Sequence, residues 1–251
     1  MTLKDSEYKL RKDLVLRIVV SEYITTVNPV SSGFIADKYH LDFSSATIRN
    51  ILADLEKEGQ LTHPHTSAGR IPTQDGYRYY VDHLMNEIQL LAEEKERIKT
   101  EYQKQVRDLE YLLDKTSEAI SDFTQYTSIV SIDGREDRIY YKGTGHIVEY
   151  VDPQDVSRIS DILQALEEKE RILEIINQDI QERFKIYIGH EMACQQMDQC
   201  SLAVSRYEIP NGPTGRITVL GPTRMNYQRV VSALDYFSDL LRESFKDVPG
   251  K

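Results

Sequence analysis

The stretch Ser44–Asp82 reads SSATIRNILADLEKEGQLTHPHTSAGRIPTQDGYRYYVD and decides the fold expected for the first third of the chain. It begins with a helix, which Ser44 or Ser45 can cap through a side-chain oxygen. Gly59 then supplies the left-handed residue at which such a helix ends. Apolar residues recur between these two points at spacings of four and three, so one helix face is expected to be buried. These residues are Ile48, Leu52 and Leu55.

The opposite face of the first two helical turns carries short polar groups, one guanidinium and one amide. Its members are Ser45, Ala46, Thr47, Arg49 and Asn50. A carboxylate is not expected on this face before Asp54. The major groove of DNA admits such a surface, because Arg can bind guanine, Asn can bind adenine, and an Ala or Thr methyl can contact thymine. The pattern therefore predicts a helix that reads base edges.

Two more helices are expected upstream, which gives helix-turn-helix order. The apolar stripe of the first helix comprises Leu10, Leu14, Val15, Ile18 and Val19. Asn28-Pro29 ends this helix, because a residue before proline avoids the helical region. Ser31 or Ser32 can cap a short second helix. This helix carries Phe34, Ile35 and Ala36.

Two short extended segments, residues 61–65 and 70–73, flank a turn of small residues and predict an exposed two-stranded wing. Pro64 and Pro72 suit a ribbon whose missing hydrogen-bond donors face solvent. We expect polar groups of this ribbon to contact phosphates or a minor groove. They are His63, His65, Thr66, Ser67 and Arg70.

Several motifs resemble the HrcA family, the heat-inducible transcription repressors of bacteria. The N-terminal matches are SSATIRN, LEKEG, PHTSAGRIPT and GYRYYVD, and a C-terminal match is VLGPTRMNY at Val219–Tyr227, preceded by a similar strand at Asp198–Tyr207. The resemblance runs from about Leu10 to Arg242. It implies a homodimeric repressor on the CIRCE inverted repeat near chaperone genes, with repression weakened by heat and the active fold supported by the GroE chaperonin.

Taken together, the residues and the resemblance predict one set of DNA-binding residues: Ser32, Ser44, Ser45, Ala46, Thr47, Arg49, Asn50, His65, Thr66, Ser67 and Arg70. The family usually has Gly in place of Ser32 and an acidic residue in place of Ile51, and both departures are expected to tune affinity. The family also carries an inserted dimerisation domain, for which this chain leaves little room. The join between Ile129 and Tyr140 is only a short turn.

Composition indicates a globular cytoplasmic protein of two small domains, with 40% hydrophobic and 29% charged residues. Apolar runs are too short for a membrane span, and the N-terminus lacks a signal-peptide core. The net charge of -10 belongs mainly to residues 86–251, because residues 1–85 hold ten basic and eleven acidic residues. A nearly neutral reader gains little from counterion release, so binding is expected to depend on dimerisation.

The rest of the chain predicts a multi-domain protein of α and α+β parts. From Asp75 to about Thr124 the composition favours one long helix or a helical hairpin, whose apolar stripe is either a packing face or a dimer seam. Strands are expected at 126–132, 138–141, 184–188, 201–209 and 215–220, and helices at 152–182 and 227–245. The expected regions are a winged helix-turn-helix (1–82), a helical connector (83–125) and a GAF-like α+β domain (126–251).

Other candidate sites are weak. His190, Cys194 and Cys200 lack the paired spacing of a metal site, and the turn at Lys142–Gly145 lacks the third glycine of a nucleotide-binding loop. Motifs of hydrolases, P-loop enzymes and zinc proteases are absent from the sequence. We predict no enzyme activity, catalytic residue, metal or cofactor. Two alternatives stay open: a regulator whose GAF-like domain senses a small molecule, and a helical scaffold with a vestigial DNA-binding head.

Overall fold

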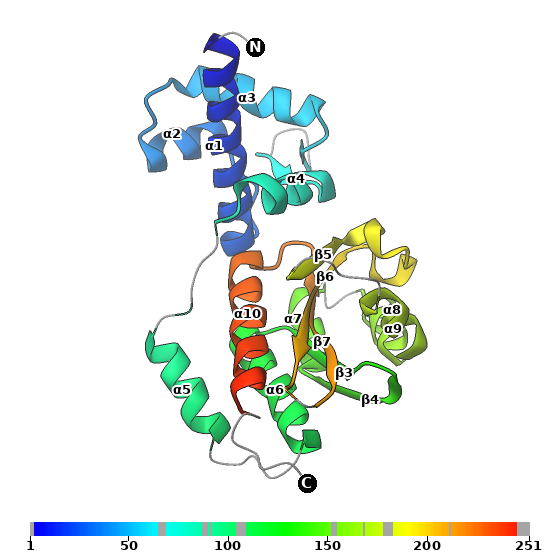
Figure 1. Cartoon of the computed structure of the whole chain (residues 1–251). Helices are drawn as coiled ribbons and strands as arrows, with labels where there is room; N and C mark the ends of the chain where they lie inside the picture. Colours follow the sequence, from blue (N-terminus) through cyan, green and yellow to red (C-terminus); the bar gives the residue numbers. More distant parts are fainter. Residues whose placement is uncertain are drawn as a thin grey trace. The chain divides into compact units, whose positions relative to one another are not determined.

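The computed structural model describes residues 3–64, 69–86, 90, 92–103, 109–151, 155–167, 169–177, 183–210 and 212–244. The chain divides into two compact units, Met1–Asn86 and Glu87–Lys251 (Figure 1). Each unit has its own buried core and is described separately. In the described residues, helices are too short or too polar to cross a membrane.

The first unit is a small helical domain with a short ribbon (Figure 1). Its helices are α1 (Leu3–Thr26), α2 (Ser32–Tyr39), α3 (Ser45–Lys57), α4 (Gln74–Tyr79) and a π-helical turn, η1 (Tyr80–Leu84). Strands β1 (Leu61–Thr62) and β2 (Ile71–Pro72) form the antiparallel ribbon. Helix α3 contacts α1, α2 and β1.

Helix α1 supplies the largest share of the core of this unit. Its buried residues are Val15, Leu16, Ile18, Val19 and Val20. The expected stripe was wrong at Leu10, which is 67% exposed. Tyr8 and Lys12 of α1 both bind α3, and Leu10 lies two residues from each. Two residues correspond to about 200° around a helix, so Leu10 points away from α3.

A buried carboxylate joins α1 to α2. Glu22 is 7% exposed and accepts hydrogen bonds from Lys38 Nζ (2.6 Å) and from the Tyr39 hydroxyl. These two donors, Lys38 first, hold the pKa of Glu22 below its usual range. Because a buried charge needs such partners, Glu22 fixes where α2 lies against α1.

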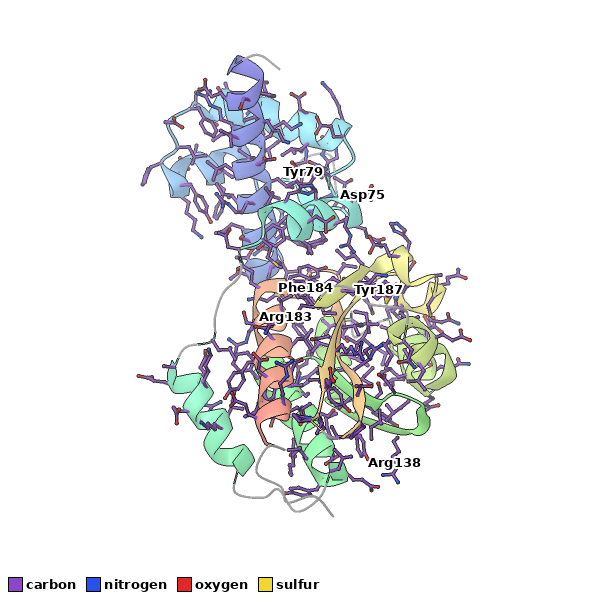
Figure 2. All side chains as sticks on the ribbon, viewed as in Figure 1. Asp75, Tyr79, Arg138, Arg183, Phe184 and Tyr187 are labelled. Atoms are coloured by element: carbon purple, nitrogen blue, oxygen red, sulfur yellow. The ribbon has the colours of Figure 1, made fainter. Side chains whose placement is uncertain are left out.

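The end of α3 and the start of α4 approach each other closely. Gly59 has φ +77°, and the Gln60 amide donates to the Leu55 carbonyl (2.9 Å), so α3 ends as predicted in a left-handed glycine cap. A Cβ added to Gly76 would lie 2.1 Å from the Gln60 carbonyl oxygen. The glycine of the GYRYYVD motif is therefore required for this approach. Tyr79 of α4, labelled in Figure 2, donates to Asp13 of α1 (2.8 Å).

The second unit is built on a five-stranded antiparallel sheet of order β4-β3-β7-β6-β5. Its strands are β3 (Thr127–Ile132), β4 (Arg135–Lys142), β5 (Phe184–Ile188), β6 (Cys200–Glu208) and β7 (Thr214–Pro222). Its α-helices are α5 (Ala92–Gln103), α6 (Leu109–Thr124), α7 (Ile147–Tyr150), α8 (Val156–Glu167), α9 (Lys169–Ile176) and α10 (Tyr227–Ser244). Three 3-10 turns are η2 (Thr144–His146), η3 (Gly189–Met192) and η4 (Gln195–Met197).

Helices cover both faces of this sheet. Ser201 and Ser205 of β6 hydrogen-bond to side chains of α10, on the face where α6 also packs. The alternate residues Leu202 and Val204 join a core with α8 and α9 on the other face. This mixed architecture is compatible with the expected GAF-like domain.

Several predicted elements are confirmed in this unit. Strand β5 has the predicted bounds, and α10 begins at the predicted Tyr227. The predicted apolar face of α10 is fully buried: Val230, Leu234, Phe237 and Leu241. Strands β6 and β7 pair antiparallel as the hairpin signal indicates, although Asn211 itself lies outside the described residues.

Of the two alternatives for the segment from Asp75 to Thr124, a long helix or a helical hairpin, the single long helix was wrong. Met85 has an extended backbone after η1, and the later part of this segment forms the separate helices α5 and α6. Helix α6 packs against β3, β4 and α10, so its apolar stripe is a packing face inside the unit. Thr116 on this packing face is buried, and its hydroxyl donates to the Leu112 carbonyl (2.7 Å).

A Glu22→Gln substitution tests the carboxylate between α1 and α2. Because the folded-state pKa is lowered, Glu22 contributes stability at pH values above its unfolded pKa of about 4.3. That contribution is lost as the pH falls through the folded-state pKa. The variant should therefore be less stable than the wild type at pH 7, with a gap that narrows toward pH 3 in urea unfolding. A gap that stays constant or widens on acidification would contradict this assignment.

A Gly76→Ala substitution tests the approach of α4 to the end of α3. The added methyl group meets backbone that cannot move independently, so the free energy of unfolding should fall by about 1–3 kcal/mol. Gly33→Ala in α2 is the matched control, because its Cβ would meet only the Ser31 hydroxyl at 3.9 Å. Equal unfolding midpoints for the two variants would rule out the close approach.

Candidate nucleic-acid interface

The N-terminus of α3 is capped by Ser44. Its Oγ accepts a hydrogen bond from the Thr47 amide (3.2 Å) and lies 3.1 Å from Thr47 Oγ1. Of the two alternatives left open by the sequence, Ser44 is therefore the cap and Ser45 is the first helical residue. Backbone amides in the first turn of a helix lack partners within the helix. They point outward from its N-terminus, which favours binding of an anion at this end of α3.

One face of α3 is sealed into the core. Its buried residues are Ile48, Ile51, Leu52 and Leu55, each no more than 4% exposed. Ile51 stands where the resembled family usually has an acidic residue. Because its side chain is fully buried, Ile51 is a core residue here. Its expected effect on DNA affinity stays a prediction.

The opposite face of the first two turns is open. Ser45, Ala46, Arg49 and Asn50 are exposed, and Thr47 is partly exposed. Within the described part of the chain, the side chains of Arg49 and Asn50 form no hydrogen bond or ion pair. A guanidinium and an amide are thus held on a rigid helix, available to an external acceptor. This is the polar face that the sequence predicts.

Helix α2 begins at Ser32, and Ser31 and Ser32 were the two candidates for its cap. Ser31 is the cap, because its Oγ accepts from the Phe34 amide (3.1 Å), and Ser32 is the first residue of α2. Ser32 is partly exposed. Ile35 faces the core, whereas Phe34 is 41% exposed.

The ribbon predicted downstream of α3 is present, with only two residues in each strand. Leu61 pairs with Pro72, and Thr62 pairs with Ile71. Pro72 is buried, so only Pro64 fits the expected exposed position. His65, Thr66 and Ser67 lie outside the described residues, and their predicted contacts with DNA stay predictions.

Arg70 differs from expectation because its guanidinium has a partner inside the protein. Its Nε donates to Glu56 Oε2 (2.9 Å), and its terminal nitrogen lies 2.7 Å from the same oxygen. His63 Nε2 lies 2.9 Å from the other carboxylate oxygen, Oε1. Glu56 was not among the predicted site residues. Its place in the LEKEG motif, one helical turn beyond Leu52, was the only feature of the sequence that pointed to it.

The other carboxylates near the end of α3 are also paired. Asp54 accepts from the Tyr8 hydroxyl (2.6 Å), and Glu58 binds Lys12 Nζ (2.5 Å). The hydrogen bond from Tyr8 lowers the pKa of Asp54, while burial and this bond raise the pKa of Tyr8 to about 12. These pairs hold the negative charges of α3 away from its exposed N-terminal face.

The weaker candidate sites have structural roles in this fold. Cys194 and Cys200 are both buried, and burial raises the pKa of the Cys200 thiol to about 12. Among the described residues there is no group of three potential metal ligands. The Gly143 carbonyl accepts from Thr127 Oγ1 (3.1 Å) and from the His146 amide (3.0 Å), as in an ordinary turn.

Arg224 lies in the turn between β7 and α10 and is partly exposed. The neighbouring Thr223 amide donates to the Gln199 carbonyl (3.0 Å), and the Thr223 carbonyl accepts from the Tyr227 hydroxyl (2.5 Å). A Cβ on Gly221 would lie 3.1 Å from the Tyr126 ring. The VLGPTRMNY motif therefore fixes the packing of this turn.

Comparisons with known proteins agree on one family. Residues 86–231 match the family model "HrcA protein C terminal domain". Two relatives, from Pelotomaculum thermopropionicum and Bacillus pumilus, are named heat-inducible transcription repressor HrcA. They are 29% and 27% identical, over 93% and 95% of this chain and 95% and 98% of their own lengths. Their names describe repressors rather than enzymes.

A solved structure titled as a hypothetical protein has the same fold, with a TM-score of 0.73 and 18% identity. The match covers 94% of this chain and 96% of that one. The alignment with the Pelotomaculum protein spans 332 positions, more than the 251 residues of this chain. That relative therefore has internal residues that this chain lacks, in line with the expected missing insertion.

A Ser44→Ala substitution tests the cap of α3. Loss of a serine cap costs about 1 kcal/mol in free energy of unfolding. Ser45→Ala should have a smaller effect, because Ser45 lies one residue inside the helix and alanine is a good helix former. Thermal unfolding of both variants measures the difference. A larger loss of stability for Ser45→Ala than for Ser44→Ala would contradict the assignment of Ser44 as the cap.

Proposed function

The chain belongs to the HrcA family, and we propose that it is a DNA-binding transcription repressor of heat-shock genes. In this proposal, α2 and α3 are a helix-turn-helix, the β1–β2 ribbon is its wing, and the second unit is a GAF-like domain. The relatives' names and the order of elements in the first unit support this assignment.

One observation carries the proposal. Helix α3 buries one face completely and leaves Arg49 and Asn50 on the other, without partners in the described residues. A side chain on the rigid surface of a helix can be aimed at base edges, because its backbone does not move when it binds. The unpaired guanidinium and amide would then gain acceptors in the major groove.

We assign the DNA contacts according to this geometry. Thr47, Arg49 and Asn50 read base edges, and Ala46 contacts a thymine methyl. Ser45 and the amides at the start of α3 hold a phosphate, for which the capped end and the helix dipole are suited. Ser44 shapes that end as the cap. Ser32 at the start of α2 contacts the flanking backbone. The same role for His65, Thr66 and Ser67 comes from the sequence pattern alone, because these residues lie outside the described part of the chain.

We further propose that the protein acts as a homodimer on an inverted-repeat operator, the CIRCE element of the family. Two readers related by a two-fold axis match two half-sites, which doubles the contact surface of a nearly neutral module. Because this chain lacks internal residues of its relatives, its dimer contacts lie in parts that the chain retains. Weakening of repression by heat and support from the GroE chaperonin stay predictions from the family resemblance.

An Arg49→Ala substitution tests base reading. It should cost about 1–3 kcal/mol on the specific site and change the preferred base at one position. Fluorescence anisotropy measures the affinity for a duplex that the wild type selects from random DNA and for a scrambled duplex. Single-base variants of the selected duplex report the preferred base.

Lys57→Ala is the matched control for Arg49→Ala. It removes one positive charge from the other end of α3, where the Lys57 side chain is 78% exposed. This control should weaken binding to both duplexes slightly and equally. If Arg49→Ala also reduces both affinities equally, Arg49 is a phosphate contact and the base-reading role fails.

A further inference from the structure

We propose that Glu56 is a positioning residue that sets the direction of the β1–β2 ribbon relative to α3. The inference rests on the proposed function, because it concerns how the reading helix and the wing meet DNA together. It concerns a carboxylate on α3 that does not itself face the DNA.

The ribbon cannot hold its own direction. Its ladder in the described residues consists of two pairs, Leu61 with Pro72 and Thr62 with Ile71, and proline donates no backbone hydrogen bond. An isolated two-stranded ribbon is at best marginally stable in water. Its orientation must therefore come from contacts with the rest of the unit.

The second arm of the ribbon is held at its loop end by the segment between α1 and α2. Val30 and Arg70 exchange backbone hydrogen bonds in both directions (2.9 and 2.8 Å). Gly69 lies so close to this segment that an added Cβ would be 2.5 Å from the Val30 carbonyl carbon. These contacts anchor one arm near its start.

Glu56 connects both arms of the ribbon to α3. One carboxylate oxygen receives Arg70 from the second arm, and the other lies 2.9 Å from His63 Nε2 on the first arm. All three side chains are partly buried, with exposed fractions of 22% for Arg70, 29% for Glu56 and 34% for His63. Charge-assisted hydrogen bonds at such a site are stronger and more directional than those in open water. One side chain of the helix thus holds two arms.

This arrangement competes with another role for Arg70, a direct contact with phosphate. The two roles predict effects of opposite sign. If Glu56 merely occupies a DNA-binding arginine, removing its charge frees that arginine and strengthens DNA binding. If Glu56 positions the ribbon, removing its charge weakens specific binding, although the protein becomes less negative.

Glu56→Gln and Glu58→Gln form a matched pair for this test. Both remove one negative charge near the end of α3, so any general electrostatic gain is the same. Glu58 binds Lys12 of α1 and not the ribbon. Titrations of the full-length variants with the selected operator duplex, at two salt concentrations, measure the difference.

We expect Glu56→Gln to bind the operator roughly tenfold more weakly than Glu58→Gln, because its charge-assisted bonds to the ribbon are lost. The base preferences set by α3 should not change. Binding by Glu56→Gln that equals or exceeds that of Glu58→Gln would overturn the proposal.

Hydrogen exchange of the free proteins gives a readout that needs no DNA. In Glu56→Gln, the Arg70 amide should exchange several-fold faster, because its bond to Val30 opens more often, while amides within α1 keep their protection. Unchanged exchange at Arg70 would also overturn the proposal. If the wild type selects no duplex at all, the proposed function fails and the exchange result alone decides the role of Glu56.

Discussion

The burial of one face of α3 is the constraint on which the proposed DNA-reading surface depends. Ile48, Ile51 and Leu55 are essentially inaccessible to water, so rotating α3 about its axis would expose large apolar side chains. The Ser44 cap and Gly59 then fix where the helix begins and ends. With rotation and both ends determined, the direction of the Arg49 side chain follows from the spacing of residues alone.

The placement of charge explains how a nearly neutral unit can present a surface suited to DNA. Asp54, Glu56 and Glu58 each bind a hydroxyl or a cation from another part of the unit. These pairs keep negative charge away from the exposed N-terminal turns of α3. They also join α3 to α1 and to the ribbon. The same carboxylates therefore neutralise charge and fix the position of α3. The net charge of a module is therefore a weaker guide to nucleic-acid binding than its distribution.

Local signals predicted much of this fold. A serine cap at Ser44 or Ser45, the Gly59 stop, the bounds of β5 and the buried face of α10 depend on a few neighbouring residues, and each was predicted from the sequence. The choice of Ser44 and the features set by long-range packing were not predicted. The break after Met85 has no proline or glycine to mark it, and Glu56 gains its role only where both ribbon arms meet α3.

The proposed dimer needs contacts other than the apolar face of α6, because this face packs on the sheet of its own unit. The Pelotomaculum relative also has internal residues that this chain lacks. The proposed function depends above all on sequence reading by the exposed face of α3. Selection of bound duplexes from random DNA by the full-length protein measures this property. We expect an enriched inverted repeat with defined half-sites. Recovery of duplexes without a shared sequence would contradict it.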